Sequence, residues 1–335
     1  MSPPVFRAGY LPGLKENQLA WQRLSFGQGD SACEVEVPVL TPAQMTALAE
    51  RVRSASQRHL KTRNLSSIIA VIDTAVARLL DEQDPYRQQL AEWLPRCSGL
   101  APDMVRLGLN AFLKTFRALQ LQRFVAEDFA NPKMLDEFQP CPKGGWAKAV
   151  GPDLLLHVWA GNVPALPLWS LVSGLLVKAG TVGKVASAEP VFASVMARLL
   201  VEVEPRWADC LAVVWWQGGD LAQERVALAQ ADVVLAYGGN DSLSALQQQV
   251  PVTTRFLPHG HKLSFGMVAA SALSIRKGQA VVQRLRLMSC VTNKVAVTRP
   301  RCFMSPRGGA SAHWSLHNVC WRNCKPCSRD SRAAT

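Results

Sequence analysis

The segment from residue 151 to residue 270 alternates short apolar runs with segments of helical character. The runs are DLLLHVW, TVGKVAS, CLAVVWW and ADVVLAY, each followed by a helical segment, and TTRFLP and LSFGMV come after them. Continuously apolar strands that alternate with helices are typical of a parallel sheet covered on both faces. Ligands of such sheets bind at the carboxyl ends of the strands. We therefore predict an α/β domain over 151–270, with its binding site at that edge.

Residues 1–150 are predicted to be mostly helical, with a short strand at ACEVEVPVL. Thr41 is expected to cap a helix that has Pro42 in its first position. A second helical pattern follows Pro102. The segment GQGDS, Gly27–Ser31, faintly resembles a hydrolase nucleophile turn, but we interpret it as an ordinary loop. Residues 271–335 would be the start of a catalytic domain that continues into an aberrant, disordered basic tail.

The net charge of +12 invites a nucleic-acid interpretation, which fails once the charges are located. Residues 285–335 hold nine Lys and Arg but one acidic residue, whereas residues 1–284 hold 28 Lys and Arg and 24 Asp and Glu. The charge is therefore a property of the tail. The chain begins without a basic and apolar secretory leader, so we expect a cytoplasmic protein with reduced thiols that binds no nucleic acid.

One stretch has the length of a membrane span, because residues 158–177 contain twenty residues without a charge. Gly161, Asn162, Pro164 and Pro167 interrupt it. We expect a buried strand, a turn and a helix with Pro164 near its start, and no membrane span. A membrane-associated protein remains an alternative at this point.

Four ordered segments carry a family resemblance. They are LHVWAGNVPALPLWSLVSGLLVKAGTVGKVASAEP, CLAVVWWQGGD, ADVVLAYGGND and TRFLPHGHKLSFGMV. Together they resemble the acyl-CoA reductase family, which includes the fatty-acid reductase component of bacterial bioluminescence and is similar to aldehyde dehydrogenases. The resemblance implies a Rossmann-type dinucleotide-binding domain within an aldehyde-dehydrogenase architecture, here with a truncated catalytic domain.

The resemblance also implies a reaction. A cysteine thiolate attacks a long-chain acyl-CoA or acyl-protein thioester, the thiol leaves, and NADPH reduces the acyl-enzyme to a fatty aldehyde. The family further implies acyl-transferase and acyl-protein synthetase partners, and a homo-oligomer at full length. An inactive nucleotide-binding pseudoenzyme or gene remnant is the alternative from another functional class.

Asn162 in GNVP is similar to the asparagine that faces the developing oxyanion in aldehyde dehydrogenases. Its alternative role is to cap a helix that begins at Val163. Lys184 is similar to the lysine that bonds the adenosine ribose, although a solvated strand end would also carry a lysine. Ser187 occupies the position where NAD-specific relatives carry a glutamate, so a 2′-phosphate is tolerated and NADP is favoured.

Glycine pairs follow two of the predicted strands and could let backbone amides approach a pyrophosphate, although ordinary strand-to-helix turns also use glycine. His259 and His261 in HGH are interpreted as structural, since two histidines without a third ligand make a poor metal site. The remaining cofactor-binding candidates at this edge are Trp159, Ala160, Gly218, Gly219, Gly238 and Gly239.

The expected nucleophile is missing from the tail. Pro258 stands about where hydrolytic relatives place a deacylating glutamate, which suits a reductase. No QGC-like loop follows, and from about Arg284 the chain loses periodicity, acids and resemblance together. Cys290 in LMSCVTN is the nearest cysteine, and it lacks the glycine that such a loop needs.

The end of the chain holds Cys320, Cys324 and Cys327 in a C-x-x-x-C-x-x-C spacing, near His313 and His317. We interpret the tail as out-of-frame translation. Thr292–Ala296, encoded ACG AAC AAG GTT GCC, gives Glu-Gln-Gly-Cys when it is read two bases later. Every Cys and Trp codon becomes a Leu, Val or Met codon in that frame. A disordered basic tail and a metal site are the alternatives.

Overall fold

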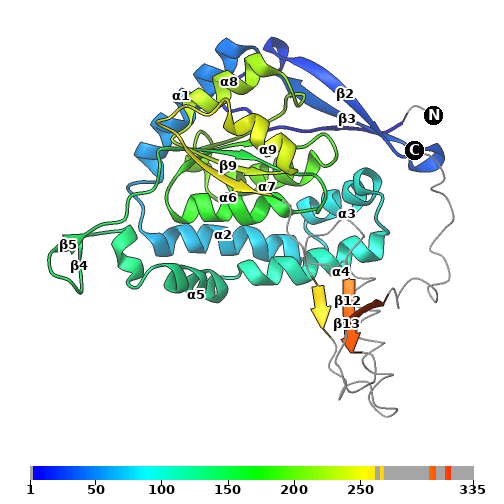
Figure 1. The fold of residues 1–335 in the computed structure, drawn as a ribbon. Helices are drawn as coiled ribbons and strands as arrows, with labels where there is room; N and C mark the ends of the chain where they lie inside the picture. Colours follow the sequence, from blue (N-terminus) through cyan, green and yellow to red (C-terminus); the bar gives the residue numbers. More distant parts are fainter. Residues whose placement is uncertain (1–2, 261–264, 268–301, 307–313, 318–335) are drawn as a thin grey trace. The chain divides into compact units, whose positions relative to one another are not determined.

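The apolar runs after residue 151 pair as one parallel sheet in the computed structural model of the chain (Figure 1). The strands lie in the order β10-β9-β6-β7-β8. The chain therefore runs from β6 through β7 to the β8 edge, and then crosses to the other side of β6 to form β9 and β10. The switch in direction lies between β6 and β9. The predicted parallel sheet is confirmed. Its strands are β6 (Leu154–Val158), β7 (Gly180–Lys184), β8 (Leu211–Val214), β9 (Val233–Tyr237) and β10 (Arg255–His259).

The structure describes residues 3–260, 265–267, 302–306 and 314–317. The chain divides into two units, Met1–Gly260 and His261–Thr335. The boundary that the sequence predicts near residue 150 falls inside the first unit. In the second unit, β11 (Phe265–Met267) pairs in parallel with β12 (Cys302–Pro306), and β13 (Trp314–His317) pairs antiparallel with β12. The remainder of the predicted aberrant tail lies outside the described residues.

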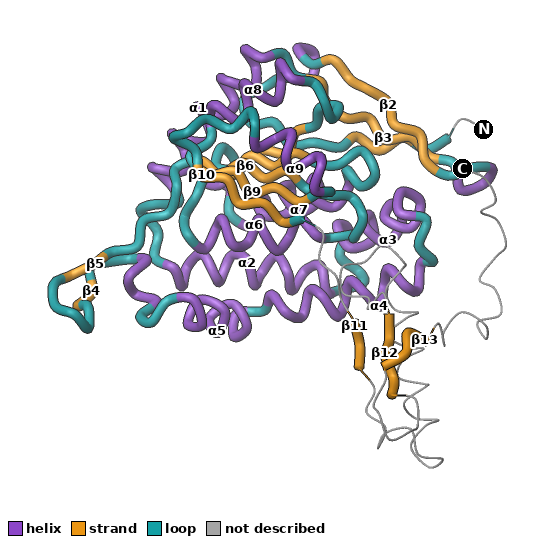
Figure 2. The backbone as a smooth tube through the Cα atoms, viewed as in Figure 1, coloured by secondary structure: helices purple, strands orange, loops and turns teal. Residues whose placement is uncertain are grey.

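Four helices connect the strands of the parallel sheet, as the alternating pattern predicts. They are α6 (Leu166–Leu176), α7 (Val191–Val203), α8 (Leu221–Gln230) and α9 (Asn240–Gln247). One buried cluster joins α6 and α7 to the helices of the N-terminal segment, and another joins α8 and α9 to the opposite face of the sheet. Figure 2 shows the sheet enclosed between these helices. The strands are therefore buried on both faces, which explains why they read as continuous apolar runs.

The twenty uncharged residues from 158 to 177 divide between the end of β6, a turn and the 11-residue helix α6. Among the described residues, every helix is too short or too polar to cross a membrane. The alternative that this stretch spans a membrane is therefore not supported.

The first 40 residues form a small sheet in the order β1-β3-β2. Its strands are β1 (Val5–Arg7), β2 (Ala20–Phe26) and β3 (Cys33–Val39), and only β3 corresponds to a strand predicted from the sequence. Isolated bridges join Val39 to Trp215 and Tyr10 to Val213, at the β8 edge of the parallel sheet. Gly27–Ser31 form a loop that ends in a short 3-10 turn, as expected.

Five helices follow in the N-terminal segment: α1 (Pro42–His59), α2 (Leu65–Leu80), α3 (Pro85–Ser98), α4 (Pro102–Leu113) and α5 (Ala118–Asp128). The predicted cap of α1 is confirmed, because Thr41 Oγ1 accepts the Gln44 N–H at 3.2 Å. Helix α1 packs on the parallel sheet and α8, and Arg53 bonds Asp232 at 3.0 Å. The N-terminal segment therefore supplies part of the cover of the sheet.

A short hairpin, β4 (Gln139–Pro140) with β5 (Trp146–Ala147), projects from the rest of the first unit (Figure 1). Phe138, Trp146 and Val150 on and beside it are 63%, 70% and 75% exposed. The remaining short elements are 3-10 turns at Glu16–Gln18, Gly29–Ser31, Lys114–Phe116, Pro132–Leu135 and Pro205–Trp207.

Candidate functional site

The carboxyl ends of the parallel strands bring together most of the residues that the sequence singles out. Residues 159–162 follow β6, Lys184 ends β7, the first glycine pair follows β8 and the second follows β9. Asn162, Ser187, Gly218 and Gly219 are exposed at this edge. Because the edge includes the switch point between β6 and β9, it has the geometry that doubly wound sheets use to bind ligands.

The loop after β6 is tightly packed against the loop after β7. A Cβ at Gly161 would lie 2.8 Å from the Cβ of Ala188, so a side chain there would force the two loops apart. Helix α6 starts at Leu166, and its N-cap is Ala165, which has a φ of 67°. The expected helix start at Val163, with Asn162 as its cap, is therefore wrong. The two prolines explain the delay, since Pro164 precedes the helix and Pro167 takes its second position.

Trp159 is a core residue. Its side chain is 3% exposed, and its indole N–H donates to Ser170 Oγ at 2.7 Å. The ring covers Gly183 of β7, where an added Cβ would overlap it. The backbone N–H of Trp159 donates to the Lys184 carbonyl at 3.0 Å. Because the indole and the backbone N–H are both engaged within the protein, Trp159 could contact a cofactor only through its carbonyl oxygen. Ala160, the next residue, is half-buried.

Lys184 lies among groups that hold its side chain in place. Its Nζ lies 5.7 Å from the centre of the Trp216 ring, a cation–π arrangement. Burial lowers the pKa of Lys184, and the Glu224 carboxylate partly offsets this. An ammonium held beside an indole and a carboxylate loses little conformational entropy when it binds a ligand. These surroundings favour a binding role for Lys184 over that of a solvated lysine at a strand end.

Ser187 is exposed, and its Oγ accepts the indole N–H of Trp215 at 3.0 Å. The hydroxyl keeps its own proton to donate. A neutral donor at this position places no negative charge beside a bound 2′-phosphate.

Each glycine pair has one backbone amide that is already bonded within the protein. The Gly219 N–H donates to Glu224 Oε1 at 3.1 Å, and the Gly238 N–H donates to the His259 carbonyl at 3.3 Å. Both amides are therefore engaged within the protein. Gly239 is the N-cap of α9 and offers no side chain to cap it. The first turn of α9 is thus the backbone feature best suited to an anion at this edge.

Two histidines near the site have structural surroundings. His259 stacks on Tyr237 with ring centres 4.8 Å apart. His157 in β6 is fully buried, and burial lowers its pKa to about 3. In the part of the chain that the structure describes, no three His, Cys, Asp or Glu residues gather as a metal site. His261 and the three C-terminal cysteines lie outside that part.

Glu189 is a functional candidate that the sequence analysis missed. Its buried carboxylate accepts the N–H groups of Val191 and Phe192, at 2.9 and 2.8 Å, and so caps α7. Burial nevertheless raises the pKa of Glu189 to about 7. The backbone N of Glu189 also faces Gly161, so the segment that carries this carboxyl lies against the loop of Asn162. Only the Glu-Pro pair before an apolar helix could have signalled it.

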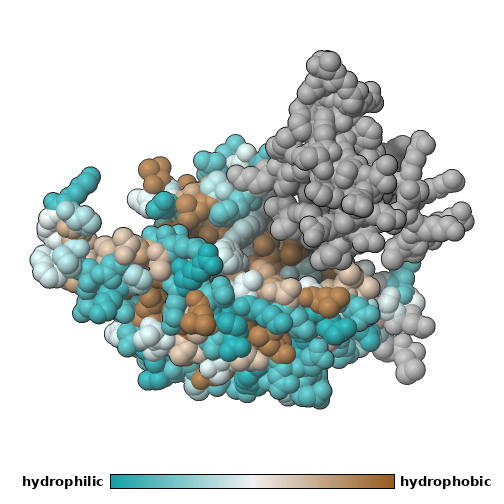
Figure 3. Space-filling view, turned by 90° about the horizontal axis from the view of Figure 1, so that it is seen from below, coloured by the Kyte–Doolittle hydropathy of each residue, from teal (hydrophilic) through white to brown (hydrophobic). Residues whose placement is uncertain are grey.

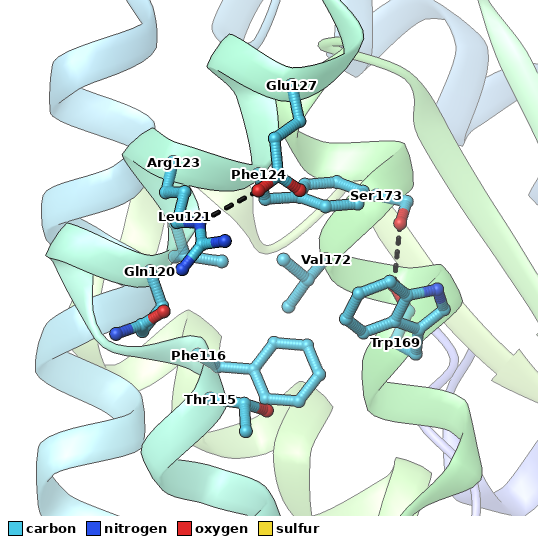
Figure 4. Close-up of a pocket in the computed structure, with 10 residues that line it drawn as sticks. All are labelled: Thr115, Phe116, Gln120, Leu121, Arg123, Phe124, Glu127, Trp169, Val172 and Ser173. Atoms are coloured by element: carbon cyan, nitrogen blue, oxygen red, sulfur yellow. Dashed lines mark hydrogen bonds and ion pairs between the residues drawn. The ribbon is translucent and has the colours of Figure 1, made fainter.

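An aromatic groove of about 220 Å³ opens beside α6 (Figure 4). Trp169, in the first turns of α6, makes edge-to-face contacts with Phe116 and Phe124, with ring centres 5.5 and 5.0 Å apart. Arg123 and Glu127 pair at 2.8 Å beside the groove. Figure 3 shows apolar patches on the otherwise hydrophilic face that carries α5. The lining residues are Thr115, Phe116, Gln120, Leu121, Arg123, Phe124, Glu127, Trp169, Val172 and Ser173.

Comparison with known proteins decides the family. The model of the acyl-CoA reductase (LuxC) family matches residues 60–311, which is most of the chain. The chain belongs to the acyl-CoA reductase (LuxC) family. The match continues past Arg284, where we expected the resemblance to end. It contains Asn162, Lys184 and Cys290.

Curated relatives agree with this assignment. The chain is 25% identical over 251 residues to a long-chain acyl-protein thioester reductase of Photorhabdus luminescens, covering 74% of this chain and 50% of the relative. It is 26% identical over 213 residues to the protein of the same name from Aliivibrio fischeri, covering 62% and 44%. The chain thus spans about half the length of the curated relatives it matches. Both relatives are, by name, reductases of long-chain acyl-protein thioesters.

Solved structures show that the fold is that of aldehyde dehydrogenases. HpcC from Thermus thermophilus superposes with a TM-score of 0.69 at 14% identity, covering 91% of this chain and 56% of that one. Betaine aldehyde dehydrogenase from Staphylococcus aureus, determined with NAD+, gives 0.69 at 12% identity, covering 89% and 57%. The predicted α/β fold class is confirmed.

Proposed function

We propose that the acyl-CoA reductase family chemistry of this chain is the NADPH-dependent reduction of a long-chain fatty acyl thioester to the aldehyde, through a cysteine acyl-enzyme. The observation that carries the proposal is the convergence of Asn162, Lys184 and Ser187 at the carboxyl edge of one parallel sheet. The acyl group comes from CoA or from an acyl-protein, and acyl-transferase and acyl-protein synthetase partners would supply it.

Asn162 is assigned to the oxyanion. It is exposed on a loop whose position is fixed by the close approach of Gly161 to Ala188, and it does not cap α6. A side-chain amide held at this edge can donate to the oxygen that becomes negative when a thiolate adds to the thioester carbonyl. The remaining step toward the aldehyde needs a hydride, which NADPH supplies when it is bound.

The residues at the edge fit NADPH. Lys184 would bond the adenosine ribose, and Ser187 would accommodate the 2′-phosphate. The uncapped first turn of α9, after Gly238 and Gly239, would face the pyrophosphate. Gly219, beside Gly218, would contribute shape alone, because its amide is already bonded to Glu224.

The aromatic groove is assigned to the acyl chain. Half of its lining residues are apolar, three of them aromatic, and Trp169 lies only seven residues beyond Asn162. Burying methylene groups against such a surface contributes about 0.8 kcal/mol for each CH₂. A groove beside α6 would therefore favour long acyl chains over short ones.

The nucleotide part of the proposal is tested by titrating the full chain with NADPH. Lys184→Ala should weaken binding more than fivefold, because a charge-assisted hydrogen bond is lost. Lys143→Ala, on the projecting hairpin, is the matched control and should bind as wild type does. Equal affinity of Lys184→Ala and wild type would remove Lys184 from the site.

The chemical part concerns the nucleophile. We propose that the present chain has essentially no reductase activity, because Cys290 lacks the glycine-containing loop of a working nucleophile and the tail is out of frame. Incubation with radiolabelled long-chain acyl-CoA should label the frame-restored protein at its Glu-Gln-Gly-Cys cysteine and leave the present chain unlabelled. Acylation of the present chain that is abolished by Cys290→Ser would refute this.

A nucleotide-binding protein without catalysis is the second candidate function for the present chain. The observation that favours it is that the proposed nucleotide edge lies wholly within residues 151–260, whereas the expected nucleophile lies beyond them. NADPH binding without acylation would identify this case. Absence of NADPH binding together with absence of acylation of the frame-restored protein would contradict both candidate functions.

Self-association at full length is also proposed. Phe138, Trp146 and Val150 leave a large apolar surface exposed around the projecting hairpin. Sedimentation of the frame-restored protein should give a species larger than one chain, and Trp146→Glu should shift it toward the monomer. A monomeric frame-restored protein would contradict the proposal.

A further inference from the structure

Arg87, in the first turn of α3, is a buried cation without a matching anion. Its side chain is enclosed, with the residue 2% exposed, and its Nη1 has no hydrogen-bond partner among the described residues. None of the ion pairs found in residues 3–260 includes it, whereas Arg78 of α2 and Arg106 of α4 have carboxylate partners. Burying an unpaired charge is costly, by several kcal/mol even after relaxation. A protein that keeps one usually holds a counter-charge there.

A small cavity adjoins this arginine. It measures about 120 Å³ and lies between α3 and α4, with Arg87 and Ala91 on one side and residues of α4 on the other. The α4 residues are Pro102, Asp103, Val105, Arg106 and Leu109. The space suffices for a carboxylate or a phosphoryl group but not for a nucleotide. It is separate from the aromatic groove beside α6, with which it shares no lining residue.

The same cavity is bordered by the start of α4. The N-cap of this helix is Ala101, which offers no side-chain acceptor to the first turn. Pro102 and Asp103, the first two residues of the helix, line the cavity. The unsatisfied N–H groups and the positive end of the helix dipole therefore add to the field of Arg87.

Other charges at the rim leave this field largely intact. Arg106 pairs with Asp103 at 3.3 Å and lies 4.0 Å from Glu82. The side chains of Asp103 and Glu82 are 84% and 54% exposed, so water screens them. Their carboxylates face Arg106, and neither bonds the enclosed guanidinium of Arg87.

We propose that the cavity between α3 and α4 is a binding site for a small oxyanion, a carboxylate or a phosphoryl group, which Arg87 bonds as its counter-ion. The planar guanidinium suits both groups, because each presents two oxygens to its paired N–H donors. The first turn of α4 completes the site. This site is independent of the proposed acyl reduction.

The test is equilibrium dialysis of the full chain against radiolabelled inorganic phosphate, with acetate and chloride as competitors at constant ionic strength. One saturable site is expected, from which acetate displaces phosphate and chloride does not. Arg87→Met should weaken binding about tenfold to a hundredfold, as for other hydrogen bonds to charged groups. Asp103→Asn should tighten it, because it removes a repelling carboxylate. Arg51→Met, which disrupts a largely exposed ion pair with Asp209, is the control and should bind as wild type does.

Stability measurements separate a binding site from a structural arginine. Phosphate should stabilise the wild type against urea and leave Arg87→Met unchanged, and in anion-free buffer the variant should be at least as stable as the wild type. Should that variant fail to fold, Arg87→Lys keeps the charge, loses the bidentate geometry and should still bind more weakly. Saturable binding of radiolabelled acetate without binding of phosphate would identify a carboxylate site. Absence of saturable binding, or equal binding by wild type and Arg87→Met, would overturn the proposal.

Discussion

Replacing Gly183 with alanine should destabilise the parallel sheet more than any other single methyl group added at its carboxyl edge. Gly183 is buried in β7 beneath the indole of Trp159. A Cβ built on Gly183 falls within 3.0 Å of three ring carbons of Trp159, whereas ordinary contacts begin near 3.4 Å. The ring or the strand must therefore move.

Neither can move freely. The indole N–H is bonded to Ser170 at 2.7 Å, and the ring stacks on His157 with centres 5.5 Å apart. Overpacking a close-packed core costs about 1–3 kcal/mol, and loss of the buried indole hydrogen bond costs about 1 kcal/mol more. We expect Gly183→Ala to lower the free energy of unfolding by about 3 kcal/mol, roughly a hundredfold in the folding equilibrium.

The assay is urea denaturation followed by tryptophan fluorescence and circular dichroism. Gly218→Ala is the matched control, because a Cβ there meets no atom within 4 Å, and it should change stability little. A Trp159→Leu background should rescue Gly183→Ala, since the smaller side chain vacates the space. A double-mutant cycle measures this coupling. Equal stabilities of Gly183→Ala and Gly218→Ala, or no rescue, would refute the reasoning.

Three further outcomes are expected. In the frame-restored protein, Asn162→Ala should lower kcat roughly a hundredfold without lowering Tm, because Asn162 does not cap α6; a change in Tm alone would contradict the oxyanion role. Trp169→Ala should raise KM for long-chain substrates and leave KM for short-chain substrates unchanged. Leu119→Ala, at a residue of α5 that is 78% exposed, is the control. Equal effects of Trp169→Ala on long and short chains would exclude the groove as the acyl-chain site. Glu189 has a pKa raised from 4.5 to about 7 in the folded chain, so it binds more protons there and stability should fall as pH rises between these values. Glu189→Gln should remove that slope in urea titrations, and parallel slopes would refute it.

The sequence was sufficient for features that depend on neighbouring residues. Buried parallel strands impose uninterrupted apolar runs, so β6 to β10 could be found by inspection. The cap of α1 was predictable because Thr41 and Gln44 lie three residues apart and bond each other locally. The same local logic failed for Asn162, where two prolines and the left-handed Ala165 delay the helix.

Features that depend on tertiary packing were not predictable. Trp216, whose ring lies beside the Lys184 ammonium, is 32 positions away from it along the chain. Trp159 and Gly183 are 24 positions apart, and only the pairing of β6 with β7 brings them together. β1 was missed because it has only three residues, and β2, an edge strand, because its polarity is mixed. Enclosure of Arg87 likewise arises from the crossing of α3 and α4, which no sequence period reveals.

The proposed nucleotide edge and the expected nucleophile lie in different parts of the chain. Among the described residues, the contacts that position Lys184, Ser187 and the loop at Gly161 include Trp216, Trp215 and Ala188, all of which lie within residues 3–260. This part has its own buried cores on both faces of the sheet. The frameshift that we propose after Arg284 would therefore leave these contacts of the nucleotide edge in place, while it would remove the thiolate on which the proposed acyl transfer depends. On this proposal nucleotide binding and acyl transfer are separable, and restoring the reading frame should add acyl transfer without changing the affinity for NADPH.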